Sequence, residues 1–344
     1  MGKKSFKKLT TLGVGGPISH FFEVATSAKI PEVVAFARKN KLKVFVIGEG
    51  SDILVSDQPF KGVVIKYTAS GVTFSSQGEE VIVKAESGLS WDDLVAKCVG
   101  QDLQGIECLS GIPGTVGAAP VQNIGAYGQE IKDVFVELTA YDTKLSKFVV
   151  LTRDQCHFSY RESVFKTKIY WQRFIITDVT LKLKKNASPQ INYASLKEYL
   201  GTSKNTPFSL ATVRQAVLKV RSNKFENYKK VPNAGSFFKN PTLTKKQLTK
   251  LLKTHPNIPC YQNEDGTYKC FAGWFIEQAG WKGKSHKNAA VSPNHALILI
   301  NPHGKAKAQD ILTLSNFIVA DVFEKFAIKL EREVQLVNFD NAKV

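Results

Sequence analysis

The sequence predicts a protein of mixed α and β structure, and three observations support that class. The chain has 344 residues, which at roughly 150 residues per domain allows two or three domains, each with its own core. Hydrophobic residues make up 43% and charged residues 22%, so the chain has the composition of a folded globular protein. Short apolar runs typical of strands alternate with amphipathic segments of helical period along the chain.

The first hundred residues follow the strand and helix order of an α/β unit. A helix capped by Ser27 is expected to run through Asn40. Ser90 and Asp93 have the spacing of a capping box, which predicts a second helix that ends near Val99. Strands are expected at 44–47, 62–67 and 81–85.

In the rest of the chain, the predicted secondary structure changes from long strands to mainly helices. Strands are expected at 135–141, 148–151 and 175–183. A polar stretch over 184–207 predicts a loop or domain junction before an amphipathic helix at 209–222. The last third is expected to hold helices at 271–279 and 305–326, a strand at 296–300 and a closing strand at 327–339.

The charge balance is the compositional feature that most needs an explanation. The chain holds 47 Lys and Arg against 30 Asp and Glu, a formal charge of +17. That surplus is compatible with nucleic-acid binding, with an enzyme that acts on anionic substrates, and with a lysine-rich surface that has no specific partner. The lysines occur singly or in pairs, with no basic tail, which favours a basic enzyme.

Three further patterns exclude classes of protein. The chain has no run of about 18 apolar residues, so we expect no membrane insertion, and no apolar stretch follows the basic start at 1–8, so we expect no secretory signal. The six histidines include no close-spaced pair, and no metal site is expected. The cysteines are odd in number and scattered, which argues against a disulfide framework or a zinc site and favours a reducing cytoplasm. They are Cys98, Cys108, Cys156, Cys260 and Cys270.

Two glycine-rich segments point to a phosphorylated ligand. Residues 48–52 follow a buried strand, where glycine N–H groups can approach a phosphate and Ser51 can donate its hydroxyl, although a tight turn is the simpler explanation. Three glycines recur every third residue within 109–118, and a nearly uncharged stretch continues to Gly128. A solvated loop would be less apolar and a core segment would hold fewer glycines. A large ligand such as a dinucleotide is therefore expected there.

Three smaller patterns carry candidate catalytic side chains. Arg161 lies between a tyrosine and a glutamate, where it can hold a carboxylate or phosphate through two hydrogen bonds or form an ordinary surface pair. Ser236 lies between a glycine and two phenylalanines, where its hydroxyl can donate a proton in a water-poor pocket or cap a turn. The spacing of Glu331 and Glu333 puts both carboxylates on one face of a strand, and a solvated face explains that pattern as well.

Six short sequence motifs, taken in order, resemble those of the UDP-N-acetylenolpyruvoylglucosamine reductase family, whose members are flavin enzymes of cell-wall synthesis. The resemblance covers about residues 9–337. The motifs are Gly48-Glu49-Gly50-Ser51, Gly111-Ile112-Pro113-Gly114-Thr115-Val116-Gly117, Gln122-Asn123-Ile124-Gly125-Ala126-Tyr127-Gly128, Tyr160-Arg161-Glu162-Ser163, Asn233-Ala234-Gly235-Ser236-Phe237-Phe238-Lys239-Asn240-Pro241, and Leu330-Glu331-x-Glu333-Val334.

The resemblance implies an α+β fold, with an FAD-binding fold of the vanillyl-alcohol-oxidase type in two subdomains and a C-terminal α+β substrate-binding domain. The first subdomain is expected at 1–68, with the C-terminal strand 327–344 returning nearby, the second at 69–208, and the substrate-binding domain at 209–326. FAD is expected to bind without a covalent link. The cofactor-binding residues implied are Gly48, Glu49, Gly50, Ser51, Asp52, Ser110, Gly111, Pro113, Gly114, Thr115, Gly117, Ala118, Asn123, Gly125, Ala126 and Tyr127.

The resemblance also implies a reaction. NADPH reduces FAD, and the enolpyruvyl ether of UDP-N-acetylglucosamine then receives a hydride at C3. Arg161 neutralises the charge that develops on the carboxylate, Glu333 polarises the same region with Glu331 as the alternate, and Ser236 donates a proton to C2. The implied substrate-binding residues are Tyr193, Lys224, Asn240 and Gln278.

We further expect a cytoplasmic monomer that serves peptidoglycan synthesis, and through it cell-wall biogenesis, cell shape and cell division, and that binds no nucleic acid. The chain departs from the family pattern at Asp52, where the family usually has asparagine. An anion would repel a pyrophosphate, so this carboxylate is expected to point away or cap a turn. Residues 10–13 read Thr-Thr-Leu-Gly where family members often have Asn-Thr-Leu-Gly. An FAD-dependent oxidoreductase with a different anionic substrate is the alternative.

Overall fold

The computed structural model describes residues 4–201 and 208–339, and the chain divides into two compact units. The large-sheet unit comprises Ile18–Glu49 and Lys61–Asn223. The C-terminal unit comprises Met1–Pro17, Gly50–Phe60 and Lys224–Val344. Residues 1–3 of the basic start, 202–207 of the expected loop and 340–344 of the returning segment lie outside the described residues. The division into three domains stays a prediction.

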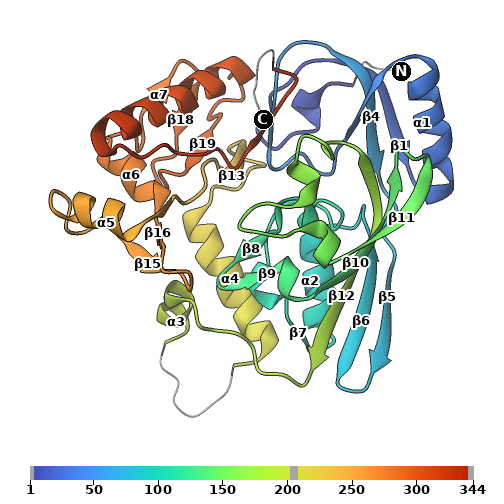
Figure 1. Cartoon of the computed structure of the whole chain (residues 1–344), viewed down its shortest axis with the longest axis horizontal. Coiled ribbons are helices and arrows are strands. Elements are labelled where there is room, and N and C mark those ends of the chain that lie inside the picture. Colours follow the sequence, from blue (N-terminus) through green and yellow to red (C-terminus); the bar gives the residue numbers. More distant parts are fainter. Residues whose placement is uncertain (1–3, 202–207, 340–344) are drawn as a thin grey trace. The chain divides into compact units, whose positions relative to one another are not determined.

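A six-stranded antiparallel sheet forms the centre of the large-sheet unit. Its order is β11-β10-β12-β6-β5, and the short β7 pairs with β12 (Figure 1). Helix α2 (Trp91–Val99) buries Trp91, Leu94 and Val95 in the core that these strands share. The strands are β5 (Val72–Gln77), β6 (Glu80–Glu86), β7 (Leu103–Gln104), β10 (Phe135–Asp142), β11 (Lys147–Thr152) and β12 (Phe174–Lys185).

A smaller sheet of the same unit has the order β1-β4-β2, with β2 and β4 parallel. Helix α1 (Ile30–Lys39), which lies between β1 and β2 in sequence, buries residues at helical spacing against this sheet's core. They include Ile30, Val34 and Ala37. The strands are β1 (Ile18–Val24), β2 (Lys43–Val46) and β4 (Phe60–Tyr67). The unit also contains the hairpin of β8 (Gly125–Ala126) and β9 (Gln129–Glu130), helix α3 (Ala194–Leu200), and helix α4 (Leu210–Lys224) up to Asn223.

The C-terminal unit is built on a four-stranded sheet of order β13-β19-β18-β17. Helix α7 (Ala308–Phe326) packs against β17, β18 and β19, and its apolar face shares one core with α6 (Ala272–Gln278). The strands are β13 (Asn233–Ser236), β17 (Ser285–His286), β18 (Ala289–Val291) and β19 (Ile298–Ile300).

Two further small sheets complete the C-terminal unit. The first has the order β14-β16-β15 and lies in sequence around α5 (Lys245–Leu252), whose N-cap Thr244 forms a capping box with Gln247. The second pairs β3 with β20 in parallel. The strands are β3 (Ile53–Val55), β14 (Thr242–Leu243), β15 (Cys260–Gln262), β16 (Tyr268–Cys270) and β20 (Gln335–Val337). Within the described residues, no helix combines the length and apolarity needed to cross a membrane.

The predicted elements are present, with four corrections. Ser27 does not cap the first helix, because it lies in a short 3₁₀ turn and α1 begins at Ile30 after Lys29. The polar stretch 184–207 was expected to be a loop or domain junction, but it contains α3. The closing strand 327–339 is wrong over most of its length: Ala327 is left-handed and ends α7, and only β20 is a strand. The capping box at Ser90 is also absent, since the Ser90 side chain makes no cap bond. The neighbouring Trp91 N–H donates to Gly114 instead, which satisfies that end of α2 from outside the helix.

Candidate functional site

The glycine-rich segment 109–118 is held against the start of α2 in the large-sheet unit. The Trp91 N–H donates to the Gly114 carbonyl at 3.0 Å, and the Trp91 indole N–H donates to the Leu109 carbonyl at 3.0 Å. Ser90 and Thr115 form an antiparallel bridge. The Ser110 hydroxyl, predicted to bind the cofactor, donates a hydrogen bond to the Glu107 carbonyl of its own loop at 2.6 Å.

Residues Gly48 and Glu49 of the first predicted loop contact this segment. The Glu49 carboxylate accepts the Gly114 N–H at 3.0 Å. A Cβ on Gly48 would lie 2.8 Å from the Thr115 hydroxyl oxygen, so a larger residue at this position would require that side chain to move. The two loops predicted to bind a dinucleotide are therefore in contact within this unit.

The remainder of the first loop belongs to the C-terminal unit. Gly50 has a φ of +63°, and a Cβ on it would lie 2.4 Å from the Leu9 carbonyl oxygen. Its own carbonyl accepts the Thr11 N–H at 3.1 Å. The carbonyl of Asp52 accepts the Gln335 N–H at 3.1 Å, which places this residue beside the start of β20.

The residues around the 111–118 segment fit a dinucleotide such as FAD. The segment offers backbone and small side chains, which allow close approach of a flat or phosphorylated ligand. Among the described residues, Ser87 Oγ and Gln122 Oε1 are buried without a hydrogen-bond partner. Buried polar atoms are normally satisfied, so atoms left unsatisfied beside these loops are suited to a polar ligand. FAD, with a polar pyrophosphate and a flat ring system, is a ligand of that chemistry.

Arg161 contacts the later part of the predicted cofactor segment, residues 123–127, at Gly125. Arg161 Nη2 donates to the Gly125 carbonyl at 2.6 Å, and its guanidinium lies 5.3 Å from the centre of the Tyr160 ring. Arg161 adopts a φ of +56°, which a non-glycine residue adopts at a cost of about 1 kcal/mol or more. The Lys166 ammonium donates to the Arg161 carbonyl at 2.9 Å and supports this turn. The predicted catalytic arginine and the predicted cofactor segment are thus brought together.

Asn123 and Tyr127 have structural contacts in the same segment. The Asn123 amide is fully buried and donates to Glu130 at 2.8 Å and to the Ser159 carbonyl at 3.0 Å, so it fixes the shape of the loop. The Tyr127 ring packs edge-on against Tyr193 with 5.5 Å between ring centres. Burial raises the pKa of both tyrosines, which keeps their hydroxyls protonated. Tyr193, the predicted substrate residue, therefore lies against the predicted cofactor segment.

The C-terminal unit brings Ser236 and Glu333 onto adjacent backbone segments. Ser236 ends β13, and the next residue, Phe237, accepts the Glu333 N–H at 2.9 Å through its carbonyl. Phe238 and Arg332 form an antiparallel bridge, and the Lys239 N–H donates to the Glu331 carbonyl at 2.8 Å. The local pairing that carries the two glutamates is thus present, although it is one bridge and not the long strand expected.

The two glutamates differ in their surroundings. Glu331 Oε1 lies 2.6 Å from the Lys239 ammonium, which is 8% exposed, whereas the Glu331 side chain is 70% exposed. Its carboxylate therefore neutralises a nearly buried cation. Glu333 is half-buried beside the Ser236 strand. The choice of Glu333 over Glu331 as the catalytic residue stays a prediction.

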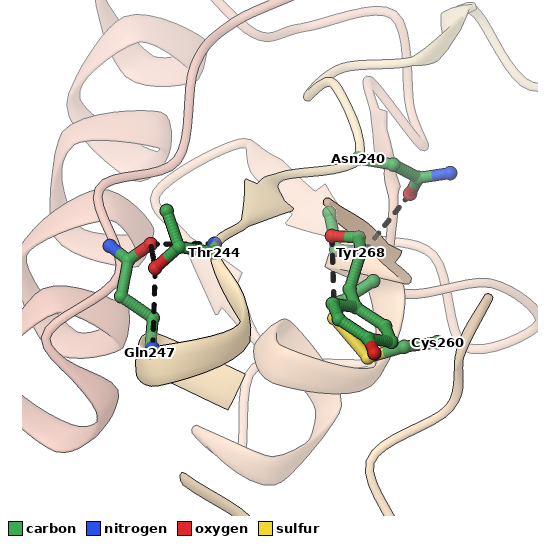
Figure 2. Close-up of a disulfide and its surroundings, with 7 residues drawn as sticks. Asn240, Thr244, Gln247, Cys260 and Tyr268 are labelled. Carbon is green, nitrogen blue, oxygen red and sulfur yellow. Dashed lines mark hydrogen bonds between the residues drawn. A yellow bond between two sulfur atoms is a disulfide. The ribbon is translucent and has the colours of Figure 1, made fainter. Parts of the chain in front are cut away.

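Asn240 is bonded to the segment that follows the hairpin of β15 and β16, and a disulfide closes that hairpin. Its side-chain oxygen accepts the Ala272 N–H at 3.0 Å (Figure 2). Two residues before Ala272, Cys270 is bonded to Cys260, and the Cys270 N–H donates to the Pro241 carbonyl at 2.9 Å. The expectation that the cysteines form no disulfide is therefore wrong for this pair. Their spacing hides the link, because only the antiparallel register of β15 and β16 places the two opposite each other.

Lys224 and Gln278, the other predicted substrate residues, are the last residues of α4 and α6. Lys224 is exposed, and its ammonium lies 5.6 Å from the centre of the Phe225 ring. Burial, aided by the nearby charges of Lys224 and Lys282, lowers the pKa of His295 to about 4, so this imidazole is neutral at pH 7. Gln278 is exposed at the end of α6, and its carbonyl accepts the Lys325 ammonium at 2.6 Å.

Sequence reasoning missed two residues that contact the glycine-rich segment, Asp92 and Arg221, and a third, Arg214, that holds Asp92. Asp92 accepts the Gly111 N–H, Arg214 pairs with Asp92, and Arg221 donates to the Gly111 carbonyl. The available signal was the seven-residue spacing of the two arginines, which puts them on one face of α4. That spacing does not reveal what the face contacts.

Comparisons with known proteins identify the family to which the chain is similar. A model of the UDP-N-acetylenolpyruvoylglucosamine reductase C-terminal domain matches residues 226–337, and a model of an FAD binding domain matches residues 18–147. The reductase of that name from Pseudomonas savastanoi pv. phaseolicola is 38% identical over 336 residues, which cover 96% of this chain and 97% of the relative. That from Thermobifida fusca is 36% identical over 342 residues and covers 95% of each chain.

The solved structures give the same result. The crystal structure of UDP-N-acetylenolpyruvylglucosamine reductase from Thermus caldophilus aligns over 98% of each chain, with a TM-score of 0.68 and 25% sequence identity. Together with the FAD binding domain match, it confirms the predicted α+β fold with an FAD-binding part and a distinct C-terminal part. The predicted enzyme class, an FAD-dependent oxidoreductase, is confirmed as well. At 38% identity over nearly its whole length, the chain belongs to the UDP-N-acetylenolpyruvoylglucosamine reductase family.

Proposed function

We propose that this protein uses NADPH and bound FAD to reduce UDP-N-acetylglucosamine enolpyruvate to UDP-N-acetylmuramate, a step of peptidoglycan precursor synthesis. The observation that carries the proposal is the hydrogen bond from the Glu333 N–H to the Phe237 carbonyl, which joins the backbone segment of the predicted proton donor Ser236 to that of the predicted polarising residue Glu333. A generic flavin oxidase has no need of a proton-donating serine. An oxidoreductase acting on another anionic substrate is therefore the less favoured alternative.

Each predicted catalytic side chain has a task that its chemistry suits. Bound FAD would supply the hydride that the enolpyruvyl C3 receives. Arg161 binds the substrate carboxylate and neutralises the negative charge that develops on it. Ser236 donates its hydroxyl proton to C2, which completes the addition of hydride and proton across the double bond. Glu333 polarises the region around the reacting double bond.

The proposed binding residues form a cofactor set and a substrate set. The residues proposed to hold FAD are Gly48, Glu49, Gly50, Ser51, Asp52, Ser110, Gly111, Pro113, Gly114, Thr115, Gly117, Ala118, Asn123, Gly125, Ala126 and Tyr127. The residues proposed to bind the substrate are Tyr193, Lys224, Asn240 and Gln278, and an ammonium and amides suit its diphosphate and uridine.

The excess of basic residues is consistent with this reaction. NADPH, FAD and a UDP-sugar all carry phosphates, so a formal charge of +17 draws them toward the protein. We further propose that the enzyme works as a monomer in the cytoplasm, where it serves cell-wall biogenesis and thereby cell shape and division. No nucleic-acid partner is needed to explain the charge.

Steady-state kinetics test the proposal. NADPH absorbance is followed with purified protein in the presence and absence of UDP-N-acetylglucosamine enolpyruvate, and the product is identified by mass spectrometry. NADPH consumption that depends on this substrate, with a mass gain of two hydrogens, supports the function. Flavin that NADPH reduces but this substrate does not reoxidise would point to the alternative substrate class.

A further inference from the structure

The peptide groups of Gly111 are held from both sides in the large-sheet unit. The Gly111 N–H donates to Asp92 Oδ1 at 2.6 Å, and the Gly111 carbonyl accepts from Arg221 Nε at 3.2 Å. Gly111 opens the 111–118 segment that the proposed function assigns to FAD. A residue with both backbone groups bonded cannot rotate without losing a hydrogen bond, so the segment begins in one orientation.

Asp92 is itself fixed by a bidentate ion pair. Arg214 Nη1 lies 2.5 Å from Asp92 Oδ1, and Arg214 Nη2 lies 2.9 Å from Asp92 Oδ2. The Arg214 side chain is 13% exposed and that of Asp92 is 34% exposed. Burial by itself would raise the pKa of Asp92, but the hydrogen bonds from Arg214 and Gly111 outweigh it and lower that pKa. The carboxylate is therefore ionised at neutral pH and able to hold the Gly111 N–H.

Helix α4 also fixes Gly111 by close contact. Gly111 has a φ of +71°, and a Cβ at this position would lie 2.8 Å from Leu218 Cδ2 and 3.4 Å from Arg221 Nε. Arg214, Leu218 and Arg221 are spaced four and three residues apart and share one face of α4. One face of α4 thus supplies the ion-pair partner of Asp92, the packing contact with Gly111 and the donor to the Gly111 carbonyl.

We propose that Asp92, Arg214 and Arg221 are positioning residues that set the 111–118 segment in its cofactor-binding conformation before FAD arrives. This inference rests on the proposed assignment of the segment to FAD. Fixing a binding loop in advance lowers the ordering cost of the ligand, so the effect is expected in FAD affinity. None of the three residues needs to touch the reacting atoms.

The charge of Arg221 adds to this effect. Burial is the main cause that lowers the pKa of Arg221, the like charge of Arg161 lowers it further, and the carboxylate of Asp92 opposes this shift. An anionic ligand placed near two such cations relieves their repulsion. FAD carries its negative charge on the pyrophosphate, which matches this requirement.

The test compares FAD affinity in Asp92→Asn and in the wild-type protein. Holoenzyme is diluted in steps, and the fluorescence of released flavin gives the dissociation constant. Asp92→Asn keeps an oxygen near the Gly111 N–H but loses the ion pair, so we expect FAD to bind at least about tenfold more weakly. Arg214→Lys keeps the charge but loses the two-point contact, so an intermediate value is expected. Arg214→Lys also serves if Asp92→Asn fails to fold.

Asp142→Asn is the matched control. Asp142 forms an equally close ion pair with Arg173 in the same unit, 2.6 Å between Oδ2 and Nη2, on β10 rather than beside the 111–118 segment. It should lower the melting temperature while FAD affinity stays within about twofold of wild type. A purely structural role for Asp92 would give both variants this same behaviour.

The outcomes separate the inference from the proposed function. Weaker FAD binding in Asp92→Asn and Arg214→Lys, with unchanged binding in Asp142→Asn, supports the inference. FAD affinity that is unchanged in the Asp92 and Arg214 variants, or lowered equally in all three variants, overturns it and leaves the reductase proposal standing. Wild-type protein that binds FAD but does not turn over the enolpyruvyl substrate overturns the proposed reaction and leaves the positioning role testable by affinity alone.

Discussion

Lys239 and Glu331 form an ion pair in which the ammonium is almost buried and the carboxylate is mostly exposed, 2.6 Å apart. The pair joins the segment that follows Ser236 to the segment that carries both glutamates. Removing the carboxylate would leave an ammonium in a poorly solvated position. Glu331 therefore has a structural task, and the adjacent Glu333 is left as the candidate for catalysis.

The first prediction separates these two glutamates. Glu333→Gln should slow reoxidation of reduced flavin by the enolpyruvyl substrate by at least about tenfold, because the region around the reacting double bond loses the group proposed to polarise it. Glu331→Gln should lower stability by about 1 kcal/mol, since the exposed side of the pair is screened, and leave reoxidation nearly unchanged. Stopped-flow traces and urea unfolding measure the two effects. The reverse pattern would assign the reaction to Glu331.

The second prediction concerns Ser236. Ser236→Ala should leave the reduction of flavin by NADPH intact and slow reoxidation by the enolpyruvyl substrate by about 10²–10⁴-fold, because the proton donor to C2 is lost. The two half-reactions are followed separately by flavin absorbance in a stopped-flow instrument. The NADPH half-reaction serves as the internal control. Equal slowing of both steps, or of neither, would contradict the role of this hydroxyl.

The third prediction concerns Arg161. Arg161→Lys should slow reoxidation by about 100-fold or more, because a lysine cannot hold a carboxylate through two parallel hydrogen bonds. It also loses the contact to the Gly125 carbonyl. The exposed Arg153→Lys change in the same unit is the control and should have no effect. Normal kinetics in Arg161→Lys would return this arginine to a surface role.

The fourth prediction concerns the cysteines. Burial raises the pKa of Cys98, Cys108 and Cys156 to about 12, so these thiols should resist alkylation at pH 8. After mild reduction, iodoacetamide should label only Cys260 and Cys270, as read by peptide mass spectrometry. Opening a loop with a sequence separation of 10 should cost about 2–3 kcal/mol in the C-terminal unit. Labelling without prior reduction would show that the disulfide is not formed.

The fifth prediction concerns His295 and pH. Its folded pKa of about 4 lies below the usual value of 6.5, so the unfolded chain binds a proton more readily. The resulting stability is present above pH 6.5 and is lost as pH falls toward 4, by at most about 3 kcal/mol. His295→Asn keeps an acceptor for the Leu297 N–H, bonded at 3.2 Å, and should remove this loss. Urea unfolding at pH 7.5 and 5 checks it, with exposed His303→Asn as the control.

The sequence was informative where chemistry is local. Hydrophobic period placed α1, α4 and α7, and the glycine-rich motifs identified the segments around Gly114 and Gly125. Contacts between distant residues could not be predicted in this way. The Asp92–Arg214 pair, the Glu331–Lys239 pair and the Cys260–Cys270 bond depend on how separate elements pack, and no spacing along the chain encodes that packing. Helix α3 was missed because only Leu196 of its residues is buried.

The pairing of β3 with β20 bears on how the protein is made. These parallel strands are about 280 residues apart in sequence, so β3 leaves the ribosome long before its partner exists. At a synthesis rate of about 5–20 residues per second, the delay is on the order of 15–55 seconds. The large-sheet unit is complete by Asn223 and can fold during that interval, whereas the C-terminal unit must wait for the last stretch of chain. Nascent chains stalled before residue 335 should therefore expose residues 53–55 to proteases.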